Sequence, residues 1–365
     1  MPELWIPYGN VETLVTLQAE NLGVVAGAPP DAGSVESERM SELTKGASQI
    51  FVCDTAPATL EFLRVLVPAL GEAQGVRISS PAPKRIESGV PDLKARVATL
   101  PPPVAPEEGG GPVLSPQVME RGTKLFVGTA RPDPLFGIVD ARAEACLNWV
   151  ARSRAMAAGA RKGMEPQPFQ KTEAFDALER IAADIPESKF LTLVPRSGKL
   201  WTVMEDAPFD AIRNSFPKVQ MPQSKGLVLG AGGRGYDDTF SSALRGVWSA
   251  IDGVRRTGSI LLMAECSDGL GSTALEMLVT GRMAEGERKT KYVEGLEEVF
   301  YLNKLKDEYD VLLLSGLPET YARSKLGLTT AKGTAEAVGR VLNKVGRSGK
   351  LNVVPRAPEC LVQSG

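Results

Sequence analysis

The chain contains no histidine, and this absence limits the chemistry that any site in it can perform. Histidine is the side chain that most often moves protons at neutral pH, and it is the commonest metal ligand. A site in this protein must therefore use carboxylates, Lys, Arg, Tyr, Ser, Cys or backbone amides. The cysteines are far apart and form no C-x-x-C pair, so we expect buried, reduced thiols and no metal site. They are Cys53, Cys146, Cys266 and Cys360.

Two glycine-rich loops each follow a predicted strand and precede a predicted helix. The first loop, 230–235, fits the G-x-G-x-x-G pattern that lets a backbone approach a pyrophosphate. A dinucleotide site also needs an acidic residue about 20 residues further on, whereas Glu265 lies 35 residues beyond Gly230. A glycine-rich turn, or a site for another anion at the helix start, is therefore favoured. The candidate loop residues are Gly232, Gly233, Gly269 and Gly271.

The elements that must position these loops alternate between strands and helices. In the first part of the chain, a strand at 49–53 precedes an apolar-periodic helix to residue 70, and a further strand is predicted at 123–128. Beyond about residue 226 the alternation is regular, which predicts a parallel sheet with right-handed crossovers. The strands expected there lie at 226–229, 260–264, 311–314 and 351–354.

The composition predicts two α/β domains, 1–220 and 221–365. The first contains a Pro/Gly-rich excursion over 81–117 and a hairpin at 190–204 that turns at Arg196-Ser197-Gly198-Lys199. In parallel sheets, ligands bind beyond the carboxyl ends of the strands, where both glycine loops are expected.

Several segments around the second loop resemble the nickel-pincer lactate racemase (LarA-like) family. The resemblance rests on the order of 258–266, Asp268-Gly269, Gly271-Ser272, 325–328 and 353–355, together with Ile6-Pro7-Tyr8-Gly9 and the Asp54 turn near the N-terminus. It is diffuse but colinear over nearly the whole chain. It implies two α/β domains with the active site in the cleft between them, where a lysine-tethered pyridinium cofactor holds nickel and carries a hydride.

The residues that anchor this cofactor in the family have no counterparts here. The segment 128–137 is similar to the family's His-to-Gly motif, with Asp133 in place of the histidine and Gly137 in register, and the lysine position falls on Ala143. The neighbouring Arg142 cannot replace the lysine, because a guanidinium stays protonated. The cofactor is thus unknown: the nickel-pincer group is expected for the family but lacks its anchors.

The resemblance also identifies three positions where this chain differs from the family, two in the second domain and one in the first. The family's Gln and Lys fall on Ser242 and Arg245, and its Asp-x-Thr-Arg-Pro turn reads Asp54-Thr55-Ala56-Pro57, without the arginine. We expect Asp54 and Ser242 to remain substrate-binding positions.

If the chain is an enzyme, the resemblance implies an isomerase, a racemase or epimerase of hydroxy acids or sugar acids. Asp133 would take a proton if burial raised its pKa, and arginines would hold the substrate carboxylate. The catalytic candidates are Asp133, Glu265 and Tyr236, and the remaining substrate-binding candidates are Arg131, Arg234, Asp237 and Arg245.

The alternative is a non-catalytic ligand-binding or regulatory protein that keeps the fold without the catalytic parts. Structural roles then explain the same residues: Asp133 as a turn residue, Asp237 as a helix N-cap, and Arg142 and Arg245 as solvated helix charges. Glu265 would cap neighbouring amides, and Ser272 would cap the helix after the second loop.

Composition restricts the partners. With 42 basic and 44 acidic side chains the formal net charge is −2, so no electrostatic footprint for nucleic acid or an anionic membrane is expected. The start of the chain lacks a signal-peptide pattern, and no apolar run approaches a membrane span, which predicts a cytoplasmic protein. We expect a small anionic metabolite as ligand.

Overall fold

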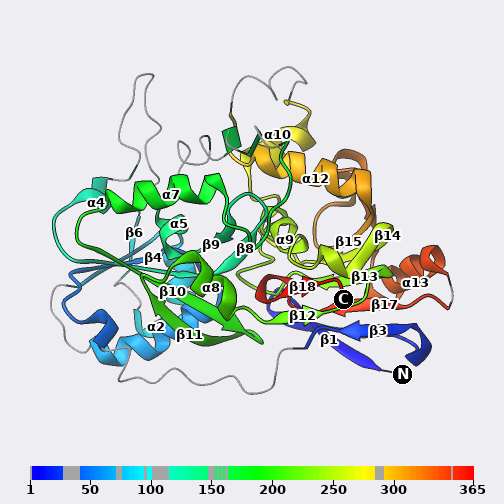
Figure 1. Ribbon diagram of the computed structural model, residues 1–365, viewed down its shortest axis with the longest axis horizontal. Coiled ribbons are helices and arrows are strands. Elements are labelled where there is room, and N and C mark those ends of the chain that lie inside the picture. Colours follow the sequence, from blue (N-terminus) through cyan, green and yellow to red (C-terminus); the bar gives the residue numbers. More distant parts are fainter. Residues whose placement is uncertain are drawn as a thin grey trace.

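The computed structural model describes residues 2–27, 42–70, 76–93, 97–100, 114, 116–146, 153, 156–157, 159–160, 163–283, 292–346 and 348–365. Its described part contains two six-stranded sheets that lie side by side (Figure 1). This is an α/β fold, as the alternation of strands and helices predicts.

The first sheet has the strand order β11-β10-β7-β4-β5-β6, and all neighbouring strands are parallel except β10 and β11. The β10–β11 hairpin lies where the turn residues predict it. Its strands are β4 (Gln49–Val52), β5 (Arg77–Ser80), β6 (Val97–Thr99), β7 (Lys124–Thr129), β10 (Ser188–Arg196) and β11 (Lys199–Glu205).

The second sheet has the order β16-β15-β14-β13-β17-β3 and is parallel throughout. All four strands predicted beyond residue 226 are present. The strands are β13 (Ser224–Gly230), β14 (Val254–Met263), β15 (Asp310–Leu314), β16 (Thr329–Thr330), β17 (Leu351–Val354) and β3 (Leu22–Val25).

Strand β3 belongs to the second sheet although it comes from the first 25 residues. It pairs with β17, and Ala26 extends the pairing by donating its amide to the carbonyl oxygen of Val353 at 2.8 Å. The preceding hairpin of β1 (Glu3–Tyr8) and β2 (Val11–Thr16) packs Ile6 and Val15 into the core under the second sheet. The domain boundary near residue 220 stays a prediction, but β1, β2 and β3 pack with the second sheet rather than with the other strands of 1–220.

Helices cover the sheets. The part of the chain that forms the first sheet contains the helices α2 (Pro57–Leu70), α3 (Pro83–Gly89), α4 (Pro116–Met119), α5 (Ala141–Cys146), α7 (Glu173–Ala183) and α8 (Phe209–Ser215). The second half has α9 (Phe240–Val247), α10 (Thr273–Thr280), α12 (Leu296–Glu308) and α13 (Thr334–Val345), with a π-helix at Thr320–Lys325 and a 3₁₀ turn at Ala357–Glu359. Short pairs β8 (Arg131–Asp133) with β9 (Gly137–Val139), and β12 (Lys218–Gln220) with β18 (Leu361–Gln363), complete the fold.

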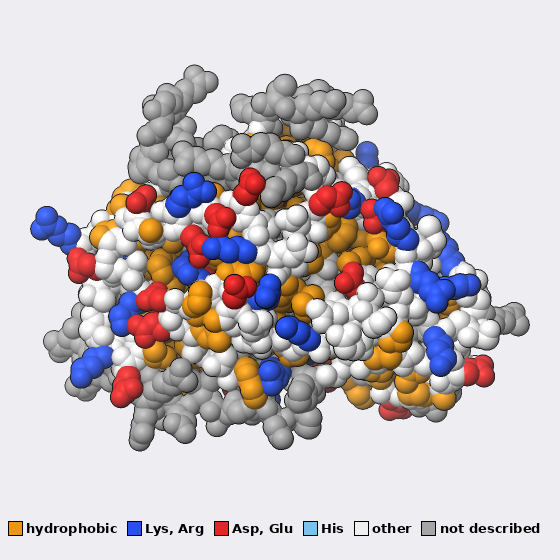
Figure 2. Space-filling model, in the orientation of Figure 1, with side chains coloured by type: hydrophobic (Ala, Val, Ile, Leu, Met, Phe, Trp, Pro, Cys, Tyr) orange, Lys and Arg blue, Asp and Glu red, His pale blue; other side chains and the backbone are white. Residues whose placement is uncertain are grey.

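Parts of two predicted segments lie outside the described residues. In the excursion 81–117, residues 94–96, 101–113 and 115 are not described, and the helix predicted over 139–160 is described as α5 and a few isolated positions. Within the described part, no helix combines the length and apolar character needed to cross a bilayer. On the face drawn in Figure 2, acidic and basic side chains are interspersed with apolar ones over the half formed by the first sheet.

Candidate functional site

The predicted site residues lie where the carboxyl ends of the strands of both sheets come together. Asp54 follows β4, the first glycine loop follows β13, and Glu265 follows β14. The residues form three groups rather than one. A further cavity lies beside them, lined by residues that the sequence did not single out.

The first group is a buried ion-pair cluster around Arg245 on α9. Its Nη2 donates to Glu298 on α12, and its Nη1 lies 3.9 Å from Oδ2 of Asp133. Burial lowers the pKa of Arg245, but the carboxylates of Glu298 and Asp133 outweigh it and raise that pKa above its ordinary value. With 12% of its side chain exposed, Arg245 is not the solvated helix charge of the structural interpretation.

Asp133 is bound on both of its oxygens. Oδ1 accepts hydrogen bonds from the amides of Leu135 and Phe136 at 2.8 and 2.9 Å, and Oδ2 faces Arg245. The residue is 3% exposed. This is the turn role that an aspartate before a proline favours. Its role as a catalytic base stays a prediction, which this arrangement does not favour.

The second group joins the N-terminal hairpin to the glycine loops. Oδ2 of Asp237 accepts the amides of Gly9 at 2.8 Å and Glu265 at 3.2 Å, so Asp237 is not the N-cap of α9; Thr239 is. Burial raises the pKa of Asp237 despite these two hydrogen bonds. The Glu265 carboxylate lies against Gly9 and leaves no room for a side chain there.

Tyr8 lies at the edge of the second group. Burial raises its pKa to about 12, and the charges of Cys266, Glu265 and Asp237 add to the effect.

The third group lies around Tyr236 and joins the part of the chain that forms the first sheet to the part that forms the second. Oδ1 of Asp54 accepts from the Ala56 amide and the Thr59 hydroxyl, and Oδ2 accepts from the Thr129 amide, so Asp54 ties the β4–α2 turn to β7. Arg131 pairs with Glu144.

The hydroxyl of Tyr236 is buried and has no hydrogen-bond partner among the described residues. Burial, with Glu359 and Asp54, raises its pKa well above the ordinary value, so it is protonated at neutral pH.

The glycine loops adopt the left-handed backbone that their residue type allows. Gly232, Gly233, Gly269 and Gly271 all have φ between +80° and +102°. The first amides of α9 are already bonded: Phe240 and Ser241 donate to the carbonyls of Gly269 and Leu270, and Ser242 donates to Thr239 Oγ1. The start of this helix therefore does not present these amides to an anion, and an anion-binding role of the loops stays a prediction.

The remaining predicted residues have structural partners. The Arg234 side chain donates to Asn10. Ser242 accepts a hydrogen bond from the Thr239 hydroxyl. Ser272 occupies the N-cap position of α10 but its hydroxyl makes no capping bond, and Glu294 receives the Thr273 amide instead. Among the described residues, no three His, Cys, Asp or Glu side chains converge as metal ligands.

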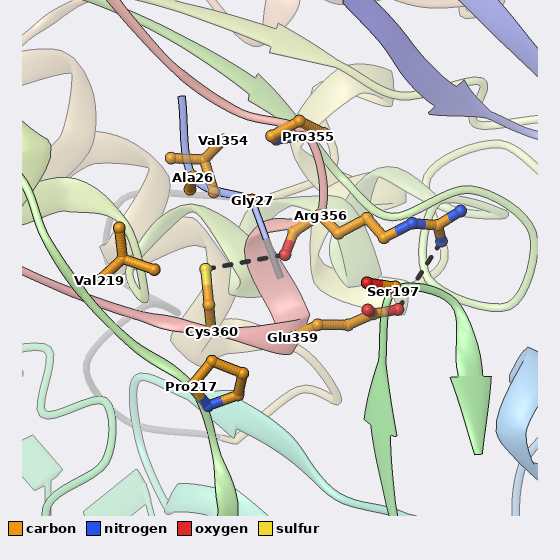
Figure 3. A pocket seen from close by; sticks show the side chains of 10 residues that line it. All are labelled: Ala26, Gly27, Ser197, Pro217, Val219, Val354, Pro355, Arg356, Glu359 and Cys360. Carbon is orange, nitrogen blue, oxygen red and sulfur yellow. Dashed lines mark hydrogen bonds and ion pairs between the residues drawn. The ribbon is translucent and has the colours of Figure 1, made fainter. Parts of the chain in front are cut away.

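A cavity of about 170 Å³ opens at the carboxyl ends of β17 and β3, between them and the β10–β11 turn (Figure 3). Arg356, Glu359 and Ser197 line one end, and apolar side chains line the other. Reasoning from the sequence missed these residues. The available signal was two charged side chains, Arg356 and Glu359, directly after a buried parallel strand.

The chain has the lactate racemase fold, an α/β fold with two six-stranded sheets. It is similar to the lactate racemase apoprotein of Thermoanaerobacterium thermosaccharolyticum, with a TM-score of 0.72 and 13% identity over 99% of this chain and 100% of that one. A protein from Thermotoga maritima is similar with a TM-score of 0.63 and 13% identity, over 90% of this chain and 97% of that one. No protein-family model and no curated protein matches the chain.

The residues that the resemblance places at the family's cofactor positions do not fit the nickel-pincer group. Ala143, at the lysine position, is fully buried and offers a methyl group where an amine is needed. Asp133, at a histidine position, already binds two amides and faces Arg245. The sequence contains no histidine that could bind the nickel.

Proposed function

We propose that this chain is a cytoplasmic ligand-binding or regulatory protein on the lactate racemase fold, and that its ligand is a small carboxylate-bearing metabolite. The observation that carries the proposal is the closed cluster of Asp133, Arg245 and Glu298. Arg245 pairs with both carboxylates, and Oε2 of Glu298 is the cluster oxygen left without a hydrogen bond among the described residues. The positions that resemble the family's reactive groups therefore serve the structure instead. A base with both oxygens engaged is poorly suited to abstract a proton.

The second candidate is a racemase or epimerase of hydroxy acids or sugar acids. The full-length likeness to a lactate racemase apoprotein supports it. Removing the hydrogen from a hydroxylated carbon needs an electron sink, which the side chains of this chain do not provide. The candidate therefore requires a cofactor held by residues other than those at the family's positions.

The two candidates differ in mass, metal content and turnover. The protein would be purified from a cell that makes the pincer cofactor, and its intact mass and nickel content would be measured. Single enantiomers of small hydroxy acids would then be incubated with it and analysed by chiral chromatography. We expect an unmodified, nickel-free chain and unchanged enantiomers. A covalent adduct with stoichiometric nickel, together with racemisation, would overturn the proposal.

Binding itself needs a separate measurement. Calorimetric titration with a panel of small hydroxycarboxylates and amino acids should show heat of binding for at least one of them. A panel without any binding would contradict the ligand-binding function.

A further inference from the structure

The cavity at the carboxyl ends of β17 and β3 has two chemically different ends (Figure 3). Pro217, Val219 and Val354 line one end together with Cys360, and Arg356, Glu359 and Ser197 lie at the other. A cavity of about 150 Å³ is known to hold a benzene molecule, and this one measures about 170 Å³. It therefore suits a ligand with a small apolar body and a polar head.

Glu359 carries one carboxylate oxygen that has no hydrogen bond among the described residues. The residue is 4% exposed, and its Oε2 accepts the amide of Gly198 at 2.9 Å. Its Oε1 is buried without a hydrogen bond in the described part of the chain, and lies 3.7 Å from Nη1 of Arg356. A buried acceptor without a donor costs free energy, which a donor on a ligand would recover.

Arg356 offers donors beside that acceptor. A guanidinium carries five N–H donors. Among the described residues, the hydrogen bond of the Arg356 side chain runs from Nη1 to the carbonyl oxygen of Gly232 at 3.1 Å. Its side chain is 26% exposed. The remaining N–H groups can therefore receive a carboxylate.

The charge of the lining selects between ligand classes. Arg356 and Glu359 are the charged residues among the described residues that line the cavity, so this lining carries no net charge. A hydroxycarboxylate would bring one uncompensated negative charge next to Glu359. A zwitterion places its ammonium beside Oε1 and its carboxylate beside the guanidinium, so both charges are paired.

Building on the proposed ligand-binding function, we infer that this cavity binds an aliphatic α-amino acid. The carboxylate of the ligand contacts Arg356, its ammonium donates to Oε1 of Glu359, and its side chain lies between Val219 and Val354. Valine and leucine have the appropriate size.

The test is calorimetric titration of the full chain with valine and leucine, and with the analogues of both in which a hydroxyl replaces the ammonium. We expect the amino acids to bind at least about tenfold more tightly than the hydroxy analogues. In the Glu359→Gln variant, which removes the charge and keeps the shape, amino-acid affinity should fall about tenfold or more while the hydroxy analogues lose little. The matched control is Glu205→Gln, which removes a carboxylate from an exposed pair with Lys189 and should change neither affinity.

A second variant keeps the inference testable if Glu359→Gln unfolds. Val219→Phe fills the apolar end from a half-buried strand position and should abolish amino-acid binding while the circular dichroism spectrum is retained. Amino-acid binding that survives both substitutions would overturn the inference. If only the hydroxycarboxylates bind tightly, the inference is overturned and the proposed function stands. If no member of the panel binds, the proposed function itself is overturned.

Discussion

Arg245 shows how one side chain can change from a candidate ligand contact into part of the core. The resemblance places it at a family lysine, and its guanidinium is held between Glu298 and Asp133. Breaking such a buried pair on one side leaves uncompensated charge, which typically costs about 3–5 kcal/mol. Arg245 therefore matters first for stability.

We accordingly predict that Arg245→Met lowers the free energy of unfolding by about 3–5 kcal/mol, measured by urea titration. Arg340→Met is the matched control, because Arg340 forms an exposed pair with Glu336 and such pairs contribute about 0–1 kcal/mol. The double variant Arg245→Met with Glu298→Met should recover part of the loss, since apolar replacement of both partners is often tolerated. A loss equal to that of the control would show that the cluster is solvated.

Tyr8 gives a pH-dependent prediction. The unfolded chain releases the phenolic proton near its ordinary pKa of about 10, whereas the folded protein retains it up to about 12. Between these values the unfolded state binds fewer protons, so stability falls as pH rises through this window. The decline should be shallower in Tyr8→Phe, measured as the urea midpoint from pH 9 to 12. Identical profiles would mean that Tyr8 is fully solvated.

At the scale of elements, the first glycine loop is a junction between the two halves. Gly235 has φ +88°, and a Cβ there would lie 2.7 Å from the Cα of Ala56. We predict that Gly235→Ala destabilises the protein by about 1–3 kcal/mol through strain and overlap. Gly339→Ala on α13 is the control: its Cβ would meet nothing within 4 Å, so the change should be neutral or stabilising by up to about 1 kcal/mol. Equal melting temperatures for the two variants would contradict this view of the loop.

Elements built from local pattern could be predicted from the sequence, and contacts between distant segments could not. The strands at 226–229, 311–314 and 351–354 are short buried runs bounded by glycine loops and helices, and β13, β15 and β17 lie there. Strand β3 was missed because its four residues become a strand only by pairing with β17.

The same reason explains why the contacts of the site could not be predicted from the sequence. Asp237 looks like a helix cap in sequence, but its partner is the amide of Gly9, 228 residues away. Charge pairing across such distances leaves no periodic signal, so the cluster of Arg245 with Asp133 and Glu298 could not be predicted.

At the scale of the whole molecule, Arg85 connects the two halves. Its guanidinium on α3 pairs with Asp238 at 2.5 Å and with Asp268. Asp238 lies just after the first glycine loop, and Asp268 lies in the second. We predict that Arg85→Ala changes global stability by less than about 1 kcal/mol, because the pair is partly exposed. The loops it holds should nevertheless exchange their amide hydrogens faster, notably Cys266 and Asp268, which donate to Asp237 and Asp238. Unchanged exchange, with Arg340→Ala as reference, would show that the loops are held without Arg85.

The pairing of β3 with β17 also sets an order of events during synthesis. Strand β3 (Leu22–Val25) leaves the ribosome long before its partner β17 (Leu351–Val354). Ile6, Val15 and Leu17 share their core with residues of β13, β14, β15, α13 and β17, so part of the apolar surface that covers them is also made late. The nascent chain must therefore carry a partly uncovered apolar hairpin until α13 and β17 have been made, which makes this segment the natural place for a chaperone to act.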